Sequence, residues 1–220
     1  GDEAEGLVTV RYIPNDSRSA QVMVTNRSGR PLTLRLPEAF AGVPVLAQMG
    51  GMGGGGGGQA GFGAGGIGAP AQTTGGAGPQ NAGMNIGGQQ GGGMFSVPPE
   101  KTRVVRVTTV CLEHGRPEPA PKKPYKLVPL DSFSNDPRLE ELMRCIGRGE
   151  VTQRVAQAAA WHIASGLTWE QLAAEKIDHA GGVPDEPFFA PAELKAAHEL
   201  VAVVTRRAGE PQAAGSSAGR

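Results

Sequence analysis

The sequence has few aromatic residues, no excess of charge of either sign and almost no cysteine. Aromatic residues make up 5% of the 220 residues, and 21 Lys and Arg balance 21 Asp and Glu. Proteins that bind nucleic acid through its phosphates need a basic surface, and those that stack bases need aromatic rings. We therefore expect no nucleic-acid partner. No apolar run approaches the roughly 18 residues needed to cross a bilayer, so we also expect no transmembrane segment.

The two cysteines, Cys111 and Cys145, are too few for a disulfide-rich scaffold. No second compact pair of metal ligands accompanies them, so we expect neither a metal nor a cofactor. The chain starts at Gly1 rather than Met, which we interpret as the sign of either a processed product or an artificially trimmed chain. A neutral chain with few aromatic residues and a long glycine tract fits an exported bacterial protein, and we expect a secreted or periplasmic location.

Glycine is concentrated in one tract. Of the 35 glycines, 22 lie between positions 50 and 93, and no charged residue occurs from 39 to 99. Such a segment buries too little apolar surface to offset its chain entropy, so we expect residues 49–93 to be a disordered insert. A G-x-G-x-x-G string at Gly63, Gly65 and Gly68 lacks the following helix that a nucleotide site requires.

Alternating apolar and polar residues flank this insert on both sides. Val8, Val10 and Tyr12 alternate with polar positions, and Val105, Val107 and further positions do so after the insert. Period-two patterns of this kind predict strands with one buried face. The sequence therefore predicts a β-domain made of residues 1–48 and 94–131, and we expect a small antiparallel sandwich of immunoglobulin-like type.

The remainder of the chain has helical patterns. Asp136 and Pro137 are typical of a helix start, and Thr168 with Gln171 forms a capping box. Residues 132–206 are therefore predicted to be a helical bundle, with a disordered tail over 207–220. The fold class expected from the sequence is α+β.

Cys111 is the first candidate functional residue, and it lies near the end of a predicted strand. His114 follows it on a predicted turn. Four interpretations of Cys111 stay open: a small buried apolar side chain, a disulfide with Cys145, a metal ligand together with His114, and a nucleophile activated by His114. We do not choose among them from the residues alone.

Gln157 is the second candidate, on a predicted alanine-rich helix over residues 150–165. Gln153, Gln157 and Trp161 recur at four-residue spacing and therefore share one helix face. A buried Gln side chain beside a large aromatic ring needs hydrogen-bond partners for its amide.

The string Ala156 to Trp161 resembles the Gln-containing helix motif of bacterial thioester domains, which are modules of surface adhesins. The resemblance implies that the Cys111 thiol would attack the Gln157 side-chain carbonyl and release ammonia. The internal thioester would then be opened by an amine of a partner, with His114 or His162 moving protons. The chain as a whole resembles uncharacterised exported proteins of planctomycete-type bacteria, which share a short β-domain, a Gly-rich insert and a Cys-Leu-Glu-His-Gly segment.

These observations favour an exported, non-enzymatic binding or structural module with a protein or cell-envelope partner. The first alternative is an adhesin-like module with a thioester between Cys111 and Gln157, flanked by His114 and Trp161. The second alternative is a metal-dependent or Cys-type hydrolase. The sequence does not identify the ligand or the oligomeric state.

Overall fold

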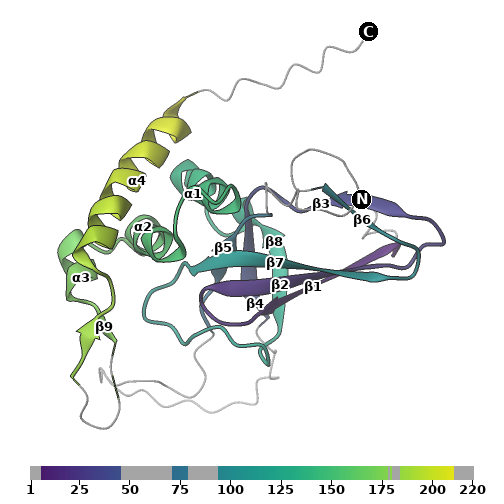
Figure 1. The fold of residues 1–220 in the computed structure, drawn as a ribbon, viewed down its shortest axis with the longest axis horizontal. Coiled ribbons are helices and arrows are strands. Elements are labelled where there is room, and N and C mark those ends of the chain that lie inside the picture. Colours follow the sequence, from purple (N-terminus) through teal and green to yellow (C-terminus); the bar gives the residue numbers. More distant parts are fainter. Residues whose placement is uncertain (1–5, 46–70, 79–93, 178, 180–183, 211–220) are drawn as a thin grey trace, which may run out of the picture.

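The structure is a computed structural model that describes residues 6–45, 71–78, 94–177, 179 and 184–210. It consists of a β-barrel followed by four helices (Figure 1). Among the described residues, no helix combines the length and the apolar character that crossing a membrane requires.

Six antiparallel strands form the barrel, in the order β1-β2-β7-β5-β4-β8. Their bounds are β1 Val8–Pro14, β2 Ser19–Asn26, β4 Phe40–Pro44, β5 Thr74–Gly76, β7 Thr102–Cys111 and β8 Tyr125–Pro129. Alternation of the kind predicted for the flanking segments is clear in β2, where Ala20, Val22 and Val24 are buried and the residues between them are partly exposed. These side chains fill the barrel together with residues of the neighbouring strands.

The predicted immunoglobulin-like sandwich is wrong, because the strands close into one barrel instead of forming two facing sheets. Closure depends on two elements. The short strand β5 joins β7 to β4, and a single pair, Tyr12 with Tyr125, joins β1 to β8. Residues alternate between a buried and an exposed face in both a sandwich and a barrel, so the alternation in the sequence does not distinguish the two architectures.

Strand β5 lies inside the range that we expected to be disordered. Residues 71–78 are buried, and Gly75 and Gly76 pass close to other elements. A Cβ atom at Gly75 would lie 2.8 Å from Met143 Sδ, and one at Gly76 would lie 2.8 Å from Phe40 Cζ. Glycine is therefore required for packing in this strand. The rest of the expected insert, residues 49–70 and 79–93, lies outside the described residues. Of the tail expected over 207–220, residues 207–209 are helical instead, in α4 Pro191–Gly209, and residues 211–220 lie outside the described residues.

A second two-stranded sheet extends from the barrel. Strand β3, Leu32–Arg35, pairs with β6, Met94–Val97. The buried Asn26 side chain fixes the start of this ribbon, since its Nδ2 donates hydrogen bonds to the carbonyl oxygens of Arg30 and Val97.

The helical part begins after the 3-10 helix Leu130–Ser132 and contains α1 Pro137–Gly147, α2 Gln153–Ser165, α3 Trp169–Ala174 and α4 Pro191–Gly209. Two short strands, β9 Lys176–Ile177 and β10 Glu186–Pro187, pair between α3 and α4. The predicted caps are confirmed: Asp136 accepts a hydrogen bond from the Arg138 amide, and Thr168 and Gln171 form a capping box. Helix α2 ends at Gly166, which has a positive φ of 72°.

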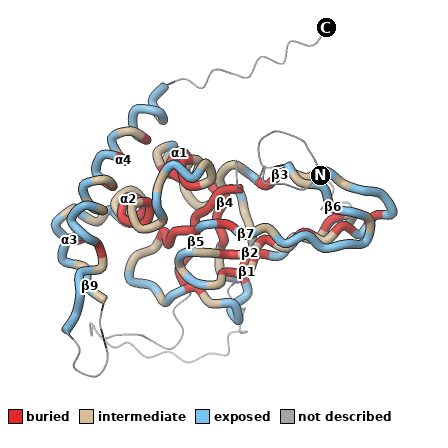
Figure 2. Tube along the Cα trace, in the orientation of Figure 1, coloured by how far each residue is buried: buried red, intermediate tan, exposed pale blue. Residues whose placement is uncertain are grey.

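Helices α1 and α2 pack against the end of the barrel where β7 finishes (Figure 1). A buried cluster runs from Val110, Cys111 and Leu112 of the barrel into these helices. A second cluster fills the barrel itself. Figure 2 shows buried residues concentrated where the helices meet the strands and along the barrel interior.

The substitution Gly42→Ala should destabilise the barrel. An added Cβ would lie 2.6 Å from the ring atom Cζ of Tyr12 and 2.7 Å from Thr74 Oγ1. We expect a loss of about 1–3 kcal/mol in the free energy of unfolding, measured by urea denaturation. Gly29→Ala is the control, because nothing lies within 4 Å of its Cβ position. Equal losses in the two variants would contradict this packing of Tyr12.

Candidate functional site

Strand β5 pairs with one edge of the end of β7, and side chains of helix α2 take the place of a strand on the other edge. Strand β2 pairs with β7 as far as Thr108, and the Thr109 amide then donates to the Arg18 carbonyl oxygen. Beyond this point the Cys111 amide donates to Gln157 Oε1 at 2.8 Å, and Gln157 Nε2 donates to the Cys111 carbonyl oxygen at 2.9 Å. Both polar atoms of the buried Gln157 side chain are therefore paired with one residue of the strand.

Gln153 makes a similar contact one turn earlier on α2. Its Nε2 donates to the Thr109 carbonyl oxygen at 3.1 Å. Four residues of α-helix rise about 6 Å, and two residues of strand extend about 6.6 Å. Gln153 and Gln157 are thus spaced to meet Thr109 and Cys111, the two residues of β7 whose backbone groups face this edge.

Cys111 and Gln157 are brought together as the sequence suggested, but the hydrogen bonds to Gln157 are made by the backbone of Cys111. The thiol is buried, with 1% of the residue exposed. Burial raises the pKa of the Cys111 thiol, and the carboxylates of Glu118, Asp16 and Glu113 raise this pKa further. The neutral thiol is therefore the stable form, and a nucleophilic thiolate is disfavoured.

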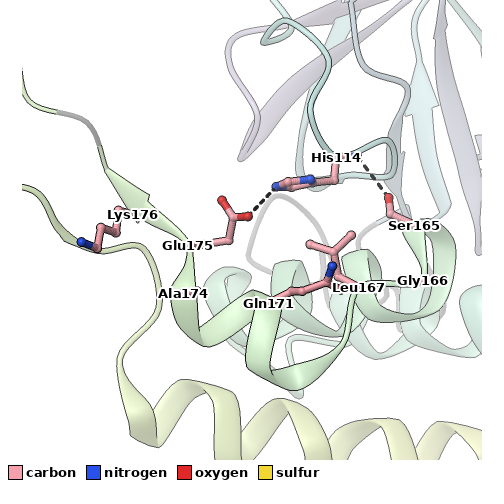
Figure 3. A pocket seen from close by; sticks show the side chains of 8 residues that line it. All are labelled: His114, Ser165, Gly166, Leu167, Gln171, Ala174, Glu175 and Lys176. Carbon is pink, nitrogen blue, oxygen red and sulfur yellow. Dashed lines mark hydrogen bonds and ion pairs between the residues drawn. The ribbon is translucent and has the colours of Figure 1, made fainter. Parts of the chain in front are cut away.

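His114 and Trp161 lie next to this junction. Their rings meet edge to face, with centroids 4.7 Å apart. His114 Nε2 lies 3.1 Å from Glu175 Oε1, at the end of α3. His114 and Glu175 line a cavity of about 430 Å³, together with residues around the end of α2 (Figure 3).

Ser165 and Glu175 are residues of this cavity that the sequence analysis missed. Ser165 Oγ accepts a hydrogen bond from the His114 amide at 3.1 Å and donates to the Leu112 carbonyl oxygen at 2.9 Å. The hydroxyl proton of Ser165 is used in that second bond, so this side chain connects α2 to the loop after β7 by hydrogen bonds. The only sequence signal is its position directly before Gly166, where the helix ends.

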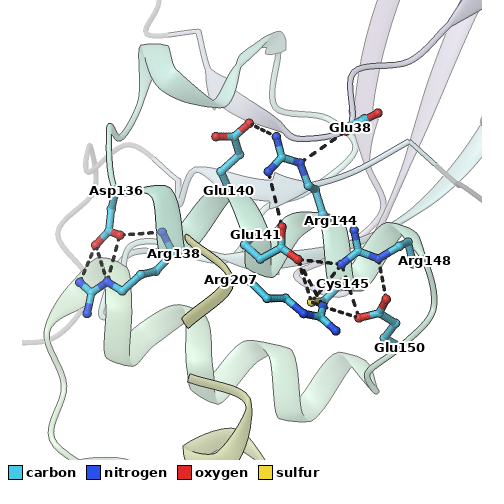
Figure 4. A network of polar contacts seen from close by, with 10 residues as sticks. All are labelled: Glu38, Asp136, Arg138, Glu140, Glu141, Arg144, Cys145, Arg148, Glu150 and Arg207. Carbon is cyan, nitrogen blue, oxygen red and sulfur yellow. Dashed lines mark hydrogen bonds and ion pairs between the residues drawn. The ribbon is translucent and has the colours of Figure 1, made fainter. Parts of the chain in front are cut away.

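Cys145 lies in α1, and both cysteines of the chain are free and buried. Burial raises the pKa of the Cys145 thiol to about 11. Arg148 and Arg207 donate to its sulfur and also to the carboxylates of Glu141 and Glu150 (Figure 4). This network ties the last turn of α4 to α1, and the disulfide between Cys111 and Cys145 is not formed.

No metal centre forms among the residues that the structure describes, because no three His, Cys, Asp or Glu side chains gather there. The Cys111 and His114 pair therefore gains no third ligand in these ranges. His114 instead interacts with Glu175 and Trp161.

An apolar groove opens on the other side of the barrel, and the sequence analysis did not predict it. Its volume is about 570 Å³, and it lies between strands β1 and β8 with the β3–β6 ribbon beside it. We call it the β1–β8 groove. Its lining consists of Val8, Val10, Val24, Leu34, Arg35, Leu36, Pro37, Phe95, Tyr125, Lys126, Leu127, Val128 and Pro129.

Gln157→Ala should destabilise the protein more than Gln153→Ala. The first change leaves the buried Cys111 amide and carbonyl groups unpaired, each at a cost of about 1–3 kcal/mol. The second removes one hydrogen bond from a partly exposed side chain, and about 0.5–1.5 kcal/mol is expected. Urea denaturation of both variants measures the difference. Equal losses would show that the Gln157 amide does not hold the end of β7.

Comparison with protein-family models, with curated proteins and with solved structures finds no match to this chain. The resemblances to planctomycete-type exported proteins and to thioester domains therefore rest on the residues quoted for them, and they stay predictions. Export stays a prediction as well.

Proposed function

We propose that this chain is a non-enzymatic binding module and that the β1–β8 groove is its binding site. The observation that carries this proposal is the groove itself, a hollow of about 570 Å³ with an apolar lining. Sites for organic ligands are typically concave and mostly apolar, with a few polar groups that orient the ligand. In this groove Arg35 and Lys126 supply the charged groups.

The state of the other candidate residues supports the same proposal. Both polar atoms of Gln157 are bonded to the Cys111 backbone, and Ser165 Oγ is bonded on both sides. Burial keeps the Cys111 thiol neutral by raising its pKa. The groups that a hydrolase would use are thus engaged in joining the helices to the barrel.

Binding of an apolar dye tests the groove directly. We expect saturable binding of 1-anilinonaphthalene-8-sulfonate to the folded chain, followed by fluorescence titration. Leu34→Asp places a charge in the groove lining and should weaken binding by about tenfold or more. Thr33→Asp is the matched control, because Thr33 is the exposed neighbour on the same strand and does not line the groove. Absence of saturable binding, or equal weakening by both folded variants, would refute the proposed site.

A second candidate function is covalent attachment through a thioester between Cys111 and Gln157. One observation favours it: the Gln157 amide directly contacts Cys111. The raised pKa of the thiol and the two hydrogen bonds of the amide favour the structural role instead.

Intact-mass spectrometry separates these two roles of Gln157. We expect the mass of the unmodified sequence and a Cys111 thiol that is alkylated after unfolding. A mass lower by one ammonia molecule, which increases by one methylamine after treatment with that amine, would establish the thioester and refute the purely structural role.

A further inference from the structure

We infer that the ligand of the β1–β8 groove is an extended segment of a partner protein, apolar at alternate positions and acidic between them, which adds to the barrel as a strand. This inference rests on the proposed function, because it names the ligand class of the same groove. It is carried by the strand edges that border the groove and by the side chains on either side of them.

The seam between β1 and β8 is open along most of its length. Strand β1 pairs with β2 over all seven residues from Val8 to Pro14, but it pairs with β8 only at Tyr12. Strand β8 pairs with β4 from Tyr125 to Pro129. Among the described residues, the edges formed by residues 8–11 of β1 and 126–128 of β8 have no strand partner on the sides that face each other.

Unpaired backbone groups at a sheet edge favour a polypeptide over an apolar small molecule. An extended peptide can donate and accept hydrogen bonds along the edge, which a hydrocarbon-like ligand cannot do. Four residues of edge correspond to about 13 Å of strand. Because β1 and β8 are antiparallel, a strand lying between them runs antiparallel to one and parallel to the other.

The closed end of the seam limits where such a strand can lie. The rings of Tyr12 and Tyr125 have centroids 6.1 Å apart. Their hydroxyl groups are already used, since Tyr12 bonds to Thr74 Oγ1 and Tyr125 donates to the Gln72 carbonyl oxygen. The added segment therefore occupies the seam on the side of residues 8–11, next to the β3–β6 ribbon.

Side-chain alternation determines the chemistry of the segment. Val10 and Leu127 line the groove and are partly buried, whereas their chain neighbours Arg11 and Lys126 are exposed, and Lys126 also belongs to the groove lining. Within the described ranges, neither Arg11 nor Lys126 forms an ion pair. A strand whose inward residues are apolar and whose outward residues are Asp or Glu would match both surfaces.

The probe for this inference is a library of randomised decapeptides displayed on phage and selected on the full chain, with Leu34→Asp used to remove peptides that bind elsewhere. We expect enriched peptides in which apolar residues alternate with Asp or Glu. Binding of the synthetic peptide should slow hydrogen exchange at the amides of residues 8–11 or 126–128. Arg11→Gln combined with Lys126→Gln should weaken binding several-fold, whereas Arg30→Gln, at an exposed arginine outside the groove lining, should not.

Backbone methylation of the selected peptide gives the deciding result. Two versions carry N-methyl groups at odd or at even positions, which keeps every side chain but removes alternate donors. We expect at least one version to bind about tenfold more weakly or worse, because it loses bonds to a strand edge.

Binding of both methylated versions as tight as that of the unmethylated peptide would overturn strand addition while leaving the groove as a binding site. Dye binding without any enriched peptide, or a groove filled by a second copy of the chain in sedimentation analysis, would also overturn it. Failure of both dye and peptides to bind would refute the proposed function itself.

Discussion

The pairing of the Gln157 amide with the Cys111 backbone joins the two halves of this protein. Strand β7 extends beyond the last residue at which β2 pairs with it. On that edge the buried backbone groups at the end of β7 need other hydrogen-bond partners. Helix α2 supplies them through Gln157 and, one turn earlier, Gln153. The helix can therefore pack directly against the end of the barrel, and the buried cluster around Val110 and Leu112 forms there.

This arrangement also separates the proposed binding groove from the helices. The helices cover the barrel end where β7 finishes, whereas the β1–β8 groove is bordered by the β3–β6 ribbon. The groove is open because β1 and β8 meet only at Tyr12 and Tyr125. One incompletely closed seam in an otherwise paired barrel thus creates the site that we propose for binding.

Local patterns predicted the elements of this fold but not how they close. Alternation gave the strands on both sides of the glycine tract, and the capping residues Asp136 and Thr168 gave helix starts that the structure confirms. The barrel was missed because strand β5 has the sequence Thr-Gly-Gly, which has no strand-like pattern. Its glycines are required by contacts with Phe40 and Met143, which are distant in the sequence.

The candidate site, like the fold, was predicted only where local sequence patterns determine it. Four-residue spacing placed Gln157 and Trp161 on one helix face, and the need of a buried amide for partners pointed to a nearby polar group. The partners are the amide and carbonyl groups of the Cys111 backbone. Because every residue has such backbone groups, the sequence does not indicate which of them Gln157 binds. The β1–β8 groove depends on which strands fail to pair, so no motif could reveal it.

Nuclear magnetic resonance coupling across the hydrogen bond tests the central claim most directly. We predict a measurable scalar coupling between the Cys111 amide nitrogen and the side-chain carbonyl carbon of Gln157. The bond from the Thr109 amide to the Arg18 carbonyl oxygen, at 2.9 Å, is the control in the same spectrum. A coupling seen for Thr109 but absent for Cys111 would contradict the account, since the end of β7 would then be held in another way.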